Sequence, residues 1–497
     1  MTIRRVRAPR IDFTPIRREL RLPDDFPPDA AREADRTAAA PPPLPPTDRT
    51  DLPLVTIDPP TSRDLDQAVC LARRQGGGYR VHYAIADVAA YVPADGALAA
   101  ETWNRGETVY LPDGKIPLHP LSLSEGAASL LPDQVRAAAL WTIDLDADGA
   151  TTAVRVERAA VRSRAKLSYQ GVQADVDAGR APEPVALLPE IGKLLVARGL
   201  ARGAVNLPIP EQEIEPDGTG WRLVLRAPVP VEEYNAQISL LTGACAAGIM
   251  LAGGVGLLRT MPPPSPEAVD RLRTAAGALG IAWPDGASVG TVIAAVDPGD
   301  PRAAAFLDQA AELMRGAGYT AFDGSAPAQP DHAGVGGSYA HVTAPLRRLA
   351  DRYATEVCLA LYEGREVPDW AREALPKLPD VMASTGRRSS AATRAAVDLA
   401  EAVLLAGRVG EVFEAAVVDV DQGRHADREA GNDATGSHAT GSHGNGGAPK
   451  RPAGGTVALD EPAVRARCEG DLPLGERVRV RLTTADPERR TVVFALA

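Results

Sequence analysis

Aromatic side chains and cysteines are scarce in this chain. Only 4% of its 497 residues are Phe, Trp or Tyr, and it contains 4 cysteines. The cysteines lie far apart in sequence, so none has the close spacing of a zinc-ligand pair, and we expect reduced, mostly buried thiols. They are Cys70, Cys245, Cys358 and Cys468.

Long apolar runs are also missing. No run reaches the roughly 20 residues that a membrane span requires. The basic start at Met1–Arg7 is not followed by the apolar stretch of a secretory signal. We therefore expect a cytoplasmic protein with no membrane partner. Apolar residues make up 45% of the chain, which predicts a packed body with one large core and one or two small domains.

Net positive charge, which many nucleic-acid binders carry, is absent. The formal net charge is -11. Net charge does not describe how charges are distributed, however, and a basic channel can lie within an acidic shell. Arginine-rich windows occur at Arg158–Lys166, Arg347–Arg348 and Arg387–Arg388. Composition alone therefore leaves nucleic acid open as a partner.

Aspartates gather in the segment Thr56–Gln67. Asp64 and Asp66 are two positions apart, so an extended backbone directs both carboxylates to one face. Asp58 precedes them across a proline-containing loop and can fold back onto that face. Converging carboxylates repel one another, and hard cations such as Mg²⁺ or Mn²⁺ remove that repulsion. The segment therefore predicts a metal site.

Two other interpretations of this segment stay open on local grounds. Loops rich in Asp, Pro, Ser and Thr are commonly solvated turns. The second alternative is a phosphatase that uses the first Asp of an Asp-x-Asp pair as its nucleophile. Such a motif directly follows a buried apolar strand, whereas Pro59–Arg63 precedes it here. The phosphatase is therefore the weaker alternative.

The pattern along the chain predicts an α+β protein. Residues 1–50 contain one amphipathic piece and a Pro/Ala-rich linker, too little for a domain, and the core begins at about residue 51. Alternating apolar residues predict strands, and Ala/Leu-rich segments predict helices. The predicted strands are 79–87, 108–111, 140–145 and 152–161, and the predicted helices are 232–251, 266–279, 301–316, 345–362 and most of 368–406.

The predicted helix at 345–362 begins with two arginines. Thr343 is its predicted N-cap, so Arg347 and Arg348 lie in the first turn, where the helix dipole disfavours cations. Either Arg347 pairs with Asp351 while Arg348 lies in solvent, or the helix N-terminus and an arginine together bind an anion. The aspartates upstream favour the anion site.

Residues 406–497 predict a small barrel. Short strands are predicted at 413–420, 456–459, 477–482 and 491–494, a pattern typical of an OB-fold. The Gly-, His-, Asp- and Ser-rich residues 422–455 predict a disordered insertion. Alternation places Arg477, Arg479 and Arg481 on one face of a strand, which makes that face basic.

Further segments follow the aspartates in a recognisable order. They are 84–92, 105–118, 121–130, 165–169, 202–204, 231–234 and 339–348. Together with Thr56–Gln67 they resemble the ribonuclease II / ribonuclease R family, whose catalytic region is the RNB domain. The resemblance covers about 50 to 405. It implies an RNB catalytic domain at 51–405, with a mixed β-sheet core and surrounding helices, followed by an RNA-binding barrel.

The resemblance implies a 3′-to-5′ exoribonuclease that hydrolyses single-stranded RNA to 5′-nucleoside monophosphates with two Mg²⁺ or Mn²⁺ ions. Asp58, Asp64 and Asp66, with Gln67, would hold the metals. Arg347 would stabilise negative charge on the phosphate. The expected RNA contacts are Tyr110 by stacking, Tyr169 and Glu232 at the ribose, and Arg348 and Arg479 through their charge. We expect a monomer with no organic cofactor.

The chain departs from the family's pattern in three ways. Leu349 follows Arg348 where the family often has an aromatic residue. The family's signature ends in two adjacent aspartates, and Gln67 stands where the second is expected. An amide oxygen can bind a metal but adds no charge, so a weaker metal site is expected. Residues 1–50 cannot hold the cold-shock domains of long members, so weaker binding of long or structured RNA is also expected.

Two alternative functions remain. One is an RNA-binding protein that kept the RNB fold and lost catalysis through Gln67. The other is a DNA exonuclease, which only the resemblance at Tyr169 and Glu232 disfavours.

Overall fold

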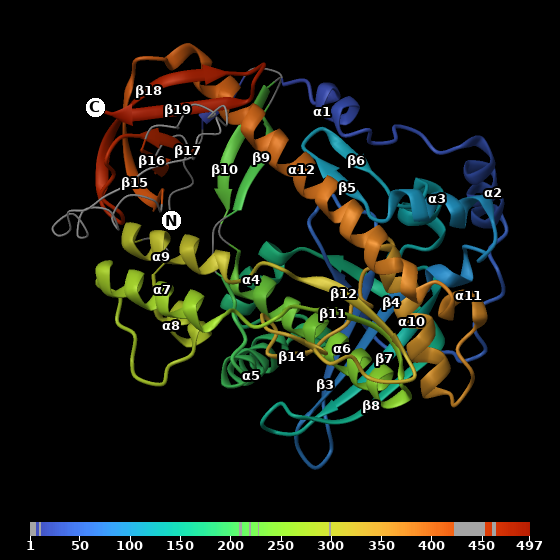
Figure 1. Ribbon diagram of the computed structural model, residues 1–497. Coiled ribbons are helices and arrows are strands. Elements are labelled where there is room, and N and C mark those ends of the chain that lie inside the picture. The colour runs from blue at the N-terminus through green and yellow to red at the C-terminus, as the bar shows by residue number, and fades with distance from the viewer. Residues whose placement is uncertain are drawn as a thin grey trace, which may run out of the picture.

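The protein contains two closed β-barrels with helices packed around them (Figure 1). The computed structural model describes residues 6–8, 11–207, 211–217, 220–226, 228–297, 300–421, 453–459 and 464–497. The larger barrel lies in the body of the protein, and the smaller one is C-terminal. The α+β class with a small C-terminal barrel, expected from the sequence, is confirmed.

Five strands form the larger barrel. In spatial order they are β2 (Leu54–Ile57), β3 (Gln67–Arg73), β4 (Tyr79–Ala86), β7 (Val135–Leu145) and β8 (Thr151–Leu167). Neighbours run antiparallel, and the parallel pairing of β2 with β8 closes the ring. The alternation that predicted 79–87 as a strand buries Val81, Tyr83 and Ile85 almost completely. The mixed sheet that we expected is therefore a closed barrel.

Helices cover this barrel and carry short strands between them. The elements that precede the β7–β8 hairpin in the chain, apart from the barrel strands, are α1 (Thr14–Glu19), α2 (Pro28–Ala39), α3 (Ala97–Arg105), β5 (Val109–Leu111) and β6 (Gly114–Ile116). After it lie α4 (Tyr169–Asp177), α5 (Leu188–Ala201), α6 (Pro230–Gly253), α7 (Pro266–Ala278), α8 (Val289–Ala295), α9 (Pro301–Glu312), α10 (Leu349–Tyr362), α11 (Asp369–Arg372) and α12 (Leu378–Leu405). The remaining strands of the body are β1 (Val6–Ala8), β9 (Glu211–Asp217), β10 (Gly220–Arg226), β11 (Val255–Thr260), β12 (Gly318–Asp323), β13 (Asp331–His332) and β14 (Gly337–Ser338).

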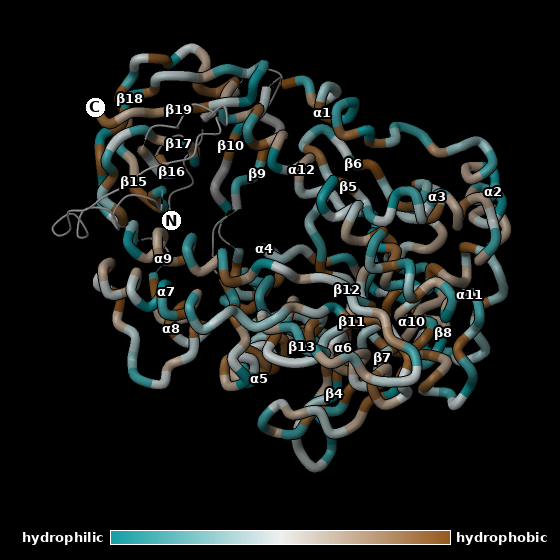
Figure 2. The backbone as a smooth tube through the Cα atoms, in the orientation of Figure 1, coloured by the Kyte–Doolittle hydropathy of each residue, from teal (hydrophilic) through white to brown (hydrophobic). Residues whose placement is uncertain are grey.

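Helix α6 lies at the centre of the body. Its 24 residues have a mean hydropathy of 1.5 in their most apolar window, so by length and composition it could cross a membrane (Figure 2). Here Val231, Ile238 and Met250 are fully buried in the same core cluster as Trp141 of the barrel. A core helix passes the same test of length and composition, and this one packs against α5 and α10.

Helix α10 begins four residues later than the sequence predicts. Thr343 is not its N-cap, because the helix starts at Leu349 and Arg348 is the capping residue. Residues 345–347 form a turn instead, and Arg348 makes an isolated antiparallel bridge with Glu107. The buried carboxylate of Asp351 explains this start, since its Oδ2 accepts a hydrogen bond from Ala344 N at 2.7 Å and holds the turn against the first helical residues.

The C-terminal barrel has the strand order β15-β16-β17-β19-β18. The strands are β15 (Val412–Val420), β16 (Gly454–Leu459), β17 (Arg465–Glu469), β18 (Arg477–Asp486) and β19 (Thr491–Leu496). The sequence analysis missed β17. Residues 422–452, most of the predicted insertion, lie outside the described residues, whereas Gly454 and Gly455 belong to β16. Helix α12 runs from the body to this barrel (Figure 1).

Substitution of Trp141 tests the larger barrel. This side chain is fully buried, so Trp141→Ala leaves a large cavity and should lower the free energy of unfolding by about 3–5 kcal/mol. Denaturant unfolding followed by far-UV circular dichroism measures the loss. Leu121→Ala is the control, because Leu121 is 52% exposed. A loss for Trp141→Ala no larger than that of the control would contradict the barrel core.

Candidate active site

The aspartate loop connects β2 to β3 at one end of the larger barrel. Asp58 directly follows β2, and its backbone N–H donates to Leu167 O at the end of β8, with an N···O distance of 3.0 Å. Asp66 directly precedes β3, and its carbonyl accepts from Ala86 N at the end of β4 at 2.9 Å. Both ends of the loop are therefore fixed by the barrel.

The middle of the loop is held by side chains from other elements. Lys166 Nζ donates to Pro60 O at 2.7 Å and also to Ser62 O. Ser129, which is fully buried, donates to Arg63 O at 2.7 Å and accepts from Leu65 N at 3.0 Å. The backbone N–H and C=O groups of a proline-containing loop cannot all form hydrogen bonds with one another, and these contacts supply partners for some of them. Leu65 is thereby buried, and the aspartates on either side of it are oriented.

Asp66 is the most buried carboxylate of the loop, at 5% exposed. Its Oδ1 accepts from Leu346 N at 2.7 Å, and its Oδ2 lies 3.4 Å from Arg347 Nε. Burial raises the pKa of Asp66 to about 7, although the Arg347 charge and the Leu346 amide both act to lower it. The carboxylate thus lies where its ionised form is poorly solvated.

The other two carboxylates share this electrostatic environment. Burial, with a smaller contribution from the charge of Asp64, raises the pKa of Asp58 to about 6, while Lys166 and Arg347 oppose the increase. Asp64 is bound by Lys115 Nζ at 3.0 Å and by the Tyr110 hydroxyl at 3.3 Å. Asp58, Asp64 and Asp66 therefore lie in one loop at one end of the barrel, near enough for the charge of Asp64 to raise the pKa of the other two.

The donor set of this site suits a hard divalent cation. It offers carboxylate oxygens, which Mg²⁺ and Mn²⁺ prefer, and two of the carboxylates are buried enough to have raised pKa values. In the parts of the chain that the structure describes, no three His, Cys, Asp or Glu side chains stand close enough to hold a metal ion together. Lys115 on Asp64 and Arg347 on Asp66 occupy oxygens that a cation would use.

Gln67 was expected to be a further metal ligand, and the structure gives its amide two protein partners. Its Nε2 donates to Thr343 O at 2.6 Å, and its Oε1 accepts from the Tyr83 hydroxyl at 2.7 Å. The Tyr83 oxygen is also 2.7 Å from Ser239 Oγ. The amide is therefore held between β4 and the segment before α10, and Tyr83 connects it to α6.

The contacts of the two arginines before α10 differ from the first arrangement considered for them, in which Arg347 pairs with Asp351 and Arg348 lies in solvent. Arg348, not Arg347, pairs with Asp351, through Nε and Nη2 at 2.9 Å each. Arg347 has a side chain that is 45% exposed and lies beside Asp66. The later start of α10 explains the exchange, because Asp351 is three residues from Arg348 in the helix. The guanidinium of Arg348 is thus engaged within the protein rather than turned to solvent.

Besides Arg348, three residues expected to contact RNA lie in the body of the protein, on β5, α4 and α6. Tyr110 on β5 is 48% exposed beside Asp64. Tyr169 is the first residue of α4, and burial, followed by the charges of Asp58 and Glu232, raises its pKa to about 12. Glu232 accepts from Val229 N at 3.1 Å and from Arg226 Nη1 at 2.7 Å.

Arg479 lies on the other barrel. It is exposed on β18, directly opposite Glu414 of β15, with an Nε to Oε1 distance of 3.8 Å. Arg477 and Arg481 share its exposed face, as the alternation predicted. An exposed ion pair of this length contributes little to stability.

Sequence analysis missed two lysines that shape the site. Lys115, which binds Asp64, also pairs with Glu125 at 2.7 Å. Lys166, which holds the loop backbone, ends an arginine-rich window that was considered only for nucleic-acid contact. The loop atoms that the two lysines bind are far from them in sequence, so no local pattern could have assigned these contacts.

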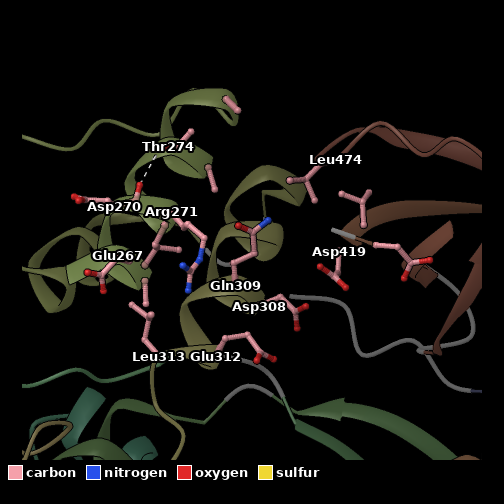
Figure 3. A pocket seen from close by; sticks show the side chains of 16 residues that line it. Glu267, Asp270, Arg271, Thr274, Asp308, Gln309, Glu312, Leu313, Asp419 and Leu474 are labelled. Atoms are coloured by element: carbon pink, nitrogen blue, oxygen red, sulfur yellow. Dashed lines mark hydrogen bonds between the residues drawn. The ribbon is translucent and has the colours of Figure 1, made fainter. Parts of the chain in front are cut away.

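Cavities among the described residues also lie away from the aspartate loop. One of about 1140 Å³ lies between α7, α9 and β15, and Figure 3 shows carboxylates around it. Its described lining includes Glu267, Asp308, Glu312 and Asp419 with a single arginine, Arg271. Such a lining repels phosphates. A second cavity, of about 960 Å³, lies beside the start of α6 and reaches Glu232.

Known families and proteins resemble this chain over most of its length. Residues 47–363 match the RNB domain, and residues 445–497 match the RNase II-type exonuclease C-terminal S1 domain. Ribonuclease R of Escherichia coli (strain K12) is 28% identical over 406 residues, which are 75% of this chain and 48% of that protein. The chain thus spans about half the length of the first curated relatives that it matches.

Solved structures show the same fold. Mycoplasma genitalium RNase R in complex with ribose methylated single-stranded RNA has a TM-score of 0.80 at 19% identity, covering 98% of this chain and 77% of that one. Yeast Ssd1, a pseudonuclease, has a TM-score of 0.62 at 15% identity, covering 88% and 53%. Because the RNB model matches residues 47–363, more than half of the chain, the protein belongs to the RNB-domain family of ribonuclease II and ribonuclease R.

Proposed function

We propose that the protein is a 3′-to-5′ exoribonuclease that releases 5′-nucleoside monophosphates from single-stranded RNA with two divalent cations, Mg²⁺ or Mn²⁺. One observation carries the proposal: a backbone amide and Arg347 hold the buried carboxylate of Asp66 in the same electrostatic environment as Asp58 and Asp64. The relative from Mycoplasma genitalium, solved with RNA, supports RNA as the substrate. The chain acts in the cytoplasm as a monomer without an organic cofactor.

The three aspartates would hold the cations. Bound there, the two cations would lower the pKa of an attacking water and stabilise the leaving 3′ oxygen. Asp58 and Asp66 are poorly solvated in their ionised forms, since burial raises both pKa values. A cation replaces the missing solvation, so ionisation of these carboxylates and cation binding favour each other. Lys115 would move off Asp64 when that oxygen binds a cation, and Glu125 remains as its partner.

Arg347 supplies a positive charge that the protein has already positioned. Its backbone oxygen accepts from Thr108 N at 2.9 Å, which fixes the start of the side chain. The guanidinium is partly exposed, so it can reach a phosphate next to Asp66. As water attacks phosphorus and the bond to the 3′ oxygen breaks, negative charge grows on the phosphate oxygens. Arg347 stabilises that charge.

Tyr169 and Glu232 would recognise the ribose. The pKa of Tyr169 is raised in part by the charges of Asp58 and Glu232, so its hydroxyl lies between the aspartate loop and α6. A 2′-hydroxyl can donate to one of these groups and accept from the other, and DNA lacks it. The exposed ring of Tyr110 offers a surface on which a base can stack. Arg479 would bind the RNA backbone farther from the reaction, and Arg348 would act through the turn that it stabilises.

A second candidate function is RNA binding without cleavage. Two observations favour it: the fold is shared with the pseudonuclease Ssd1 of yeast, and Gln67 stands where the family has an aspartate. The presence of Asp58, Asp64, Asp66 and Arg347 favours the enzyme, because RNA binding alone does not need three carboxyl groups and an arginine at one point.

Cleavage of RNA labelled at its 5′ end separates the two functions. With Mg²⁺ or Mn²⁺ the wild type should produce a ladder that shortens from the 3′ end, and EDTA should abolish it. Asp66→Asn keeps the acceptor for Leu346 N but removes the charge, so its rate should fall at least about 100-fold. Asp270→Asn, a change of an exposed aspartate on α7, should leave the rate unchanged. Binding of RNA without cleavage by the wild type would contradict the enzyme.

The raised pKa values predict a pH dependence of stability in EDTA. Between the usual value of 3.8 and the folded value of about 7 for Asp66, the folded protein binds a proton more tightly than the unfolded chain. The free energy of unfolding should therefore fall as pH rises through this window. Chemical denaturation at several pH values measures the slope. Asp66→Asn should remove much of it, and an identical slope in both proteins would disprove the assignment.

Removal of the Tyr169 hydroxyl tests whether this group contributes to discrimination between ribose and deoxyribose. Tyr169→Phe keeps the ring but loses the hydroxyl, so the ratio of RNA to DNA cleavage rates should fall about 10-fold, the effect of one hydrogen bond of about 1.4 kcal/mol. Rates on matched RNA and DNA oligonucleotides give the ratio. Tyr362→Phe is the control, since Tyr362 is 42% exposed. A ratio that Tyr169→Phe leaves unchanged would exclude this hydroxyl from sugar recognition.

A further inference from the structure

The amide of Gln67 joins three parts of the protein that carry site residues. Gln67 is the first residue of β3, next to Asp66. Its Nε2 donates to Thr343 O, in the segment that leads to Arg347, at 2.6 Å. Its Oε1 accepts from the hydroxyl of Tyr83 on β4 at 2.7 Å. The Tyr83 oxygen in turn lies 2.7 Å from Ser239 Oγ on α6.

We propose that Gln67 is a positioning residue, whose amide fixes the segment bearing Arg347 against the strand bearing Asp66, rather than a metal ligand. The proposal rests on the proposed exoribonuclease function. Asp66 and Gln67 are adjacent, and each holds one end of the same segment: Asp66 binds Leu346 N, and Gln67 binds Thr343 O. Two such contacts define both the position and the tilt of the segment.

The hydrogen-bonding pattern requires an amide. Thr343 O can only accept, so its partner must be a donor, and the Tyr83 hydroxyl donates to an oxygen of the same side chain. Gln supplies a donor and an acceptor on one planar group. A carboxylate would place a negative charge against Thr343 O, and Thr343 is only 4% exposed, so little water is available to relieve the repulsion.

The contact also reaches the helix that carries Glu232. Ser239 lies seven residues after Glu232 on α6, so the two side chains share one face of the helix two turns apart. Through Tyr83, the Gln67 amide links this face to the Arg347 segment. A displaced amide would therefore disturb the geometry between phosphate and ribose contacts, which affects turnover more than the binding of RNA.

Gln67→Glu distinguishes a positioning role from a metal ligand, because it preserves side-chain length and replaces the donor by a charge. We expect kcat on a short single-stranded RNA to fall about 10- to 100-fold while KM stays within about 3-fold. The Mg²⁺ concentration for half-maximal activity should not decrease. In EDTA, without RNA, the melting temperature should also fall, because the contact to Thr343 exists in the metal-free protein. Gln75→Glu is the matched control, since Gln75 is exposed in the β3–β4 turn.

Tyr83→Phe provides a second variant that preserves packing. It removes only the hydroxyl that donates to Gln67, so it should lower kcat in the same direction with KM again unchanged. The double variant Gln67→Glu/Tyr83→Phe should lose less than the sum of the two losses, because both changes break one network. If the losses of the two single variants were fully additive in the double variant, Gln67 and Tyr83 would not act through one network.

Different experimental results would contradict this proposal and the proposed function. A wild type without exonuclease activity contradicts the function, and the melting temperatures in EDTA then still test the contact. A Gln67→Glu variant that is fully active, melts like the wild type in EDTA and needs less Mg²⁺ would make Gln67 a metal ligand and overturn the positioning role.

Discussion

The contact between the buried carboxylate of Asp66 and the backbone amide of Leu346 is the constraint on which the site depends. It joins residues that are 280 positions apart in sequence, at an N···O distance of 2.7 Å. On one side the closed barrel holds the aspartate loop, and on the other Asp351 holds the turn before α10. The contact brings Arg347 to the carboxylates. Burial at this position costs solvation and raises the pKa of Asp66 to about 7, although Arg347 and the Leu346 amide both act to lower it. Under the proposed function, a cation bound at this site would replace the lost solvation.

Much of the fold could be predicted from local patterns. Alternation over residues 79–87 and the hairpin at 140–161 identified strands of the larger barrel, and the short strands after residue 412 identified the smaller one. Closure of the larger barrel could not be predicted, because β2 has only four residues and its parallel pairing with β8 depends on segments about 100 residues apart. Strand β17 was not predicted either, because its alternation of arginine with small residues is a weak apolar signal. It follows residues 460–463, which lie outside the described ranges.

The aspartates and Arg347 were predicted from their spacing and from the family resemblance, and the structure brings them together. The pairing of Arg348 with Asp351 was not predicted, because it depends on where α10 begins, and the buried Asp351 rather than a Thr cap sets that position. The partners of Gln67 and of Lys115 come from distant elements. Side-chain pairs of this kind are properties of the assembled fold, so no local pattern contains them.

Under the proposed function, Asp66 forms the binding site for the catalytic cations together with Asp58 and Asp64. Titration of the RNA-free protein with Mn²⁺, followed by electron paramagnetic resonance of the free ion, tests it directly. The wild type should bind about two Mn²⁺ ions per chain, and Asp66→Asn should bind fewer or bind them much more weakly. Equal Mn²⁺ binding by the wild type and Asp66→Asn would contradict the account.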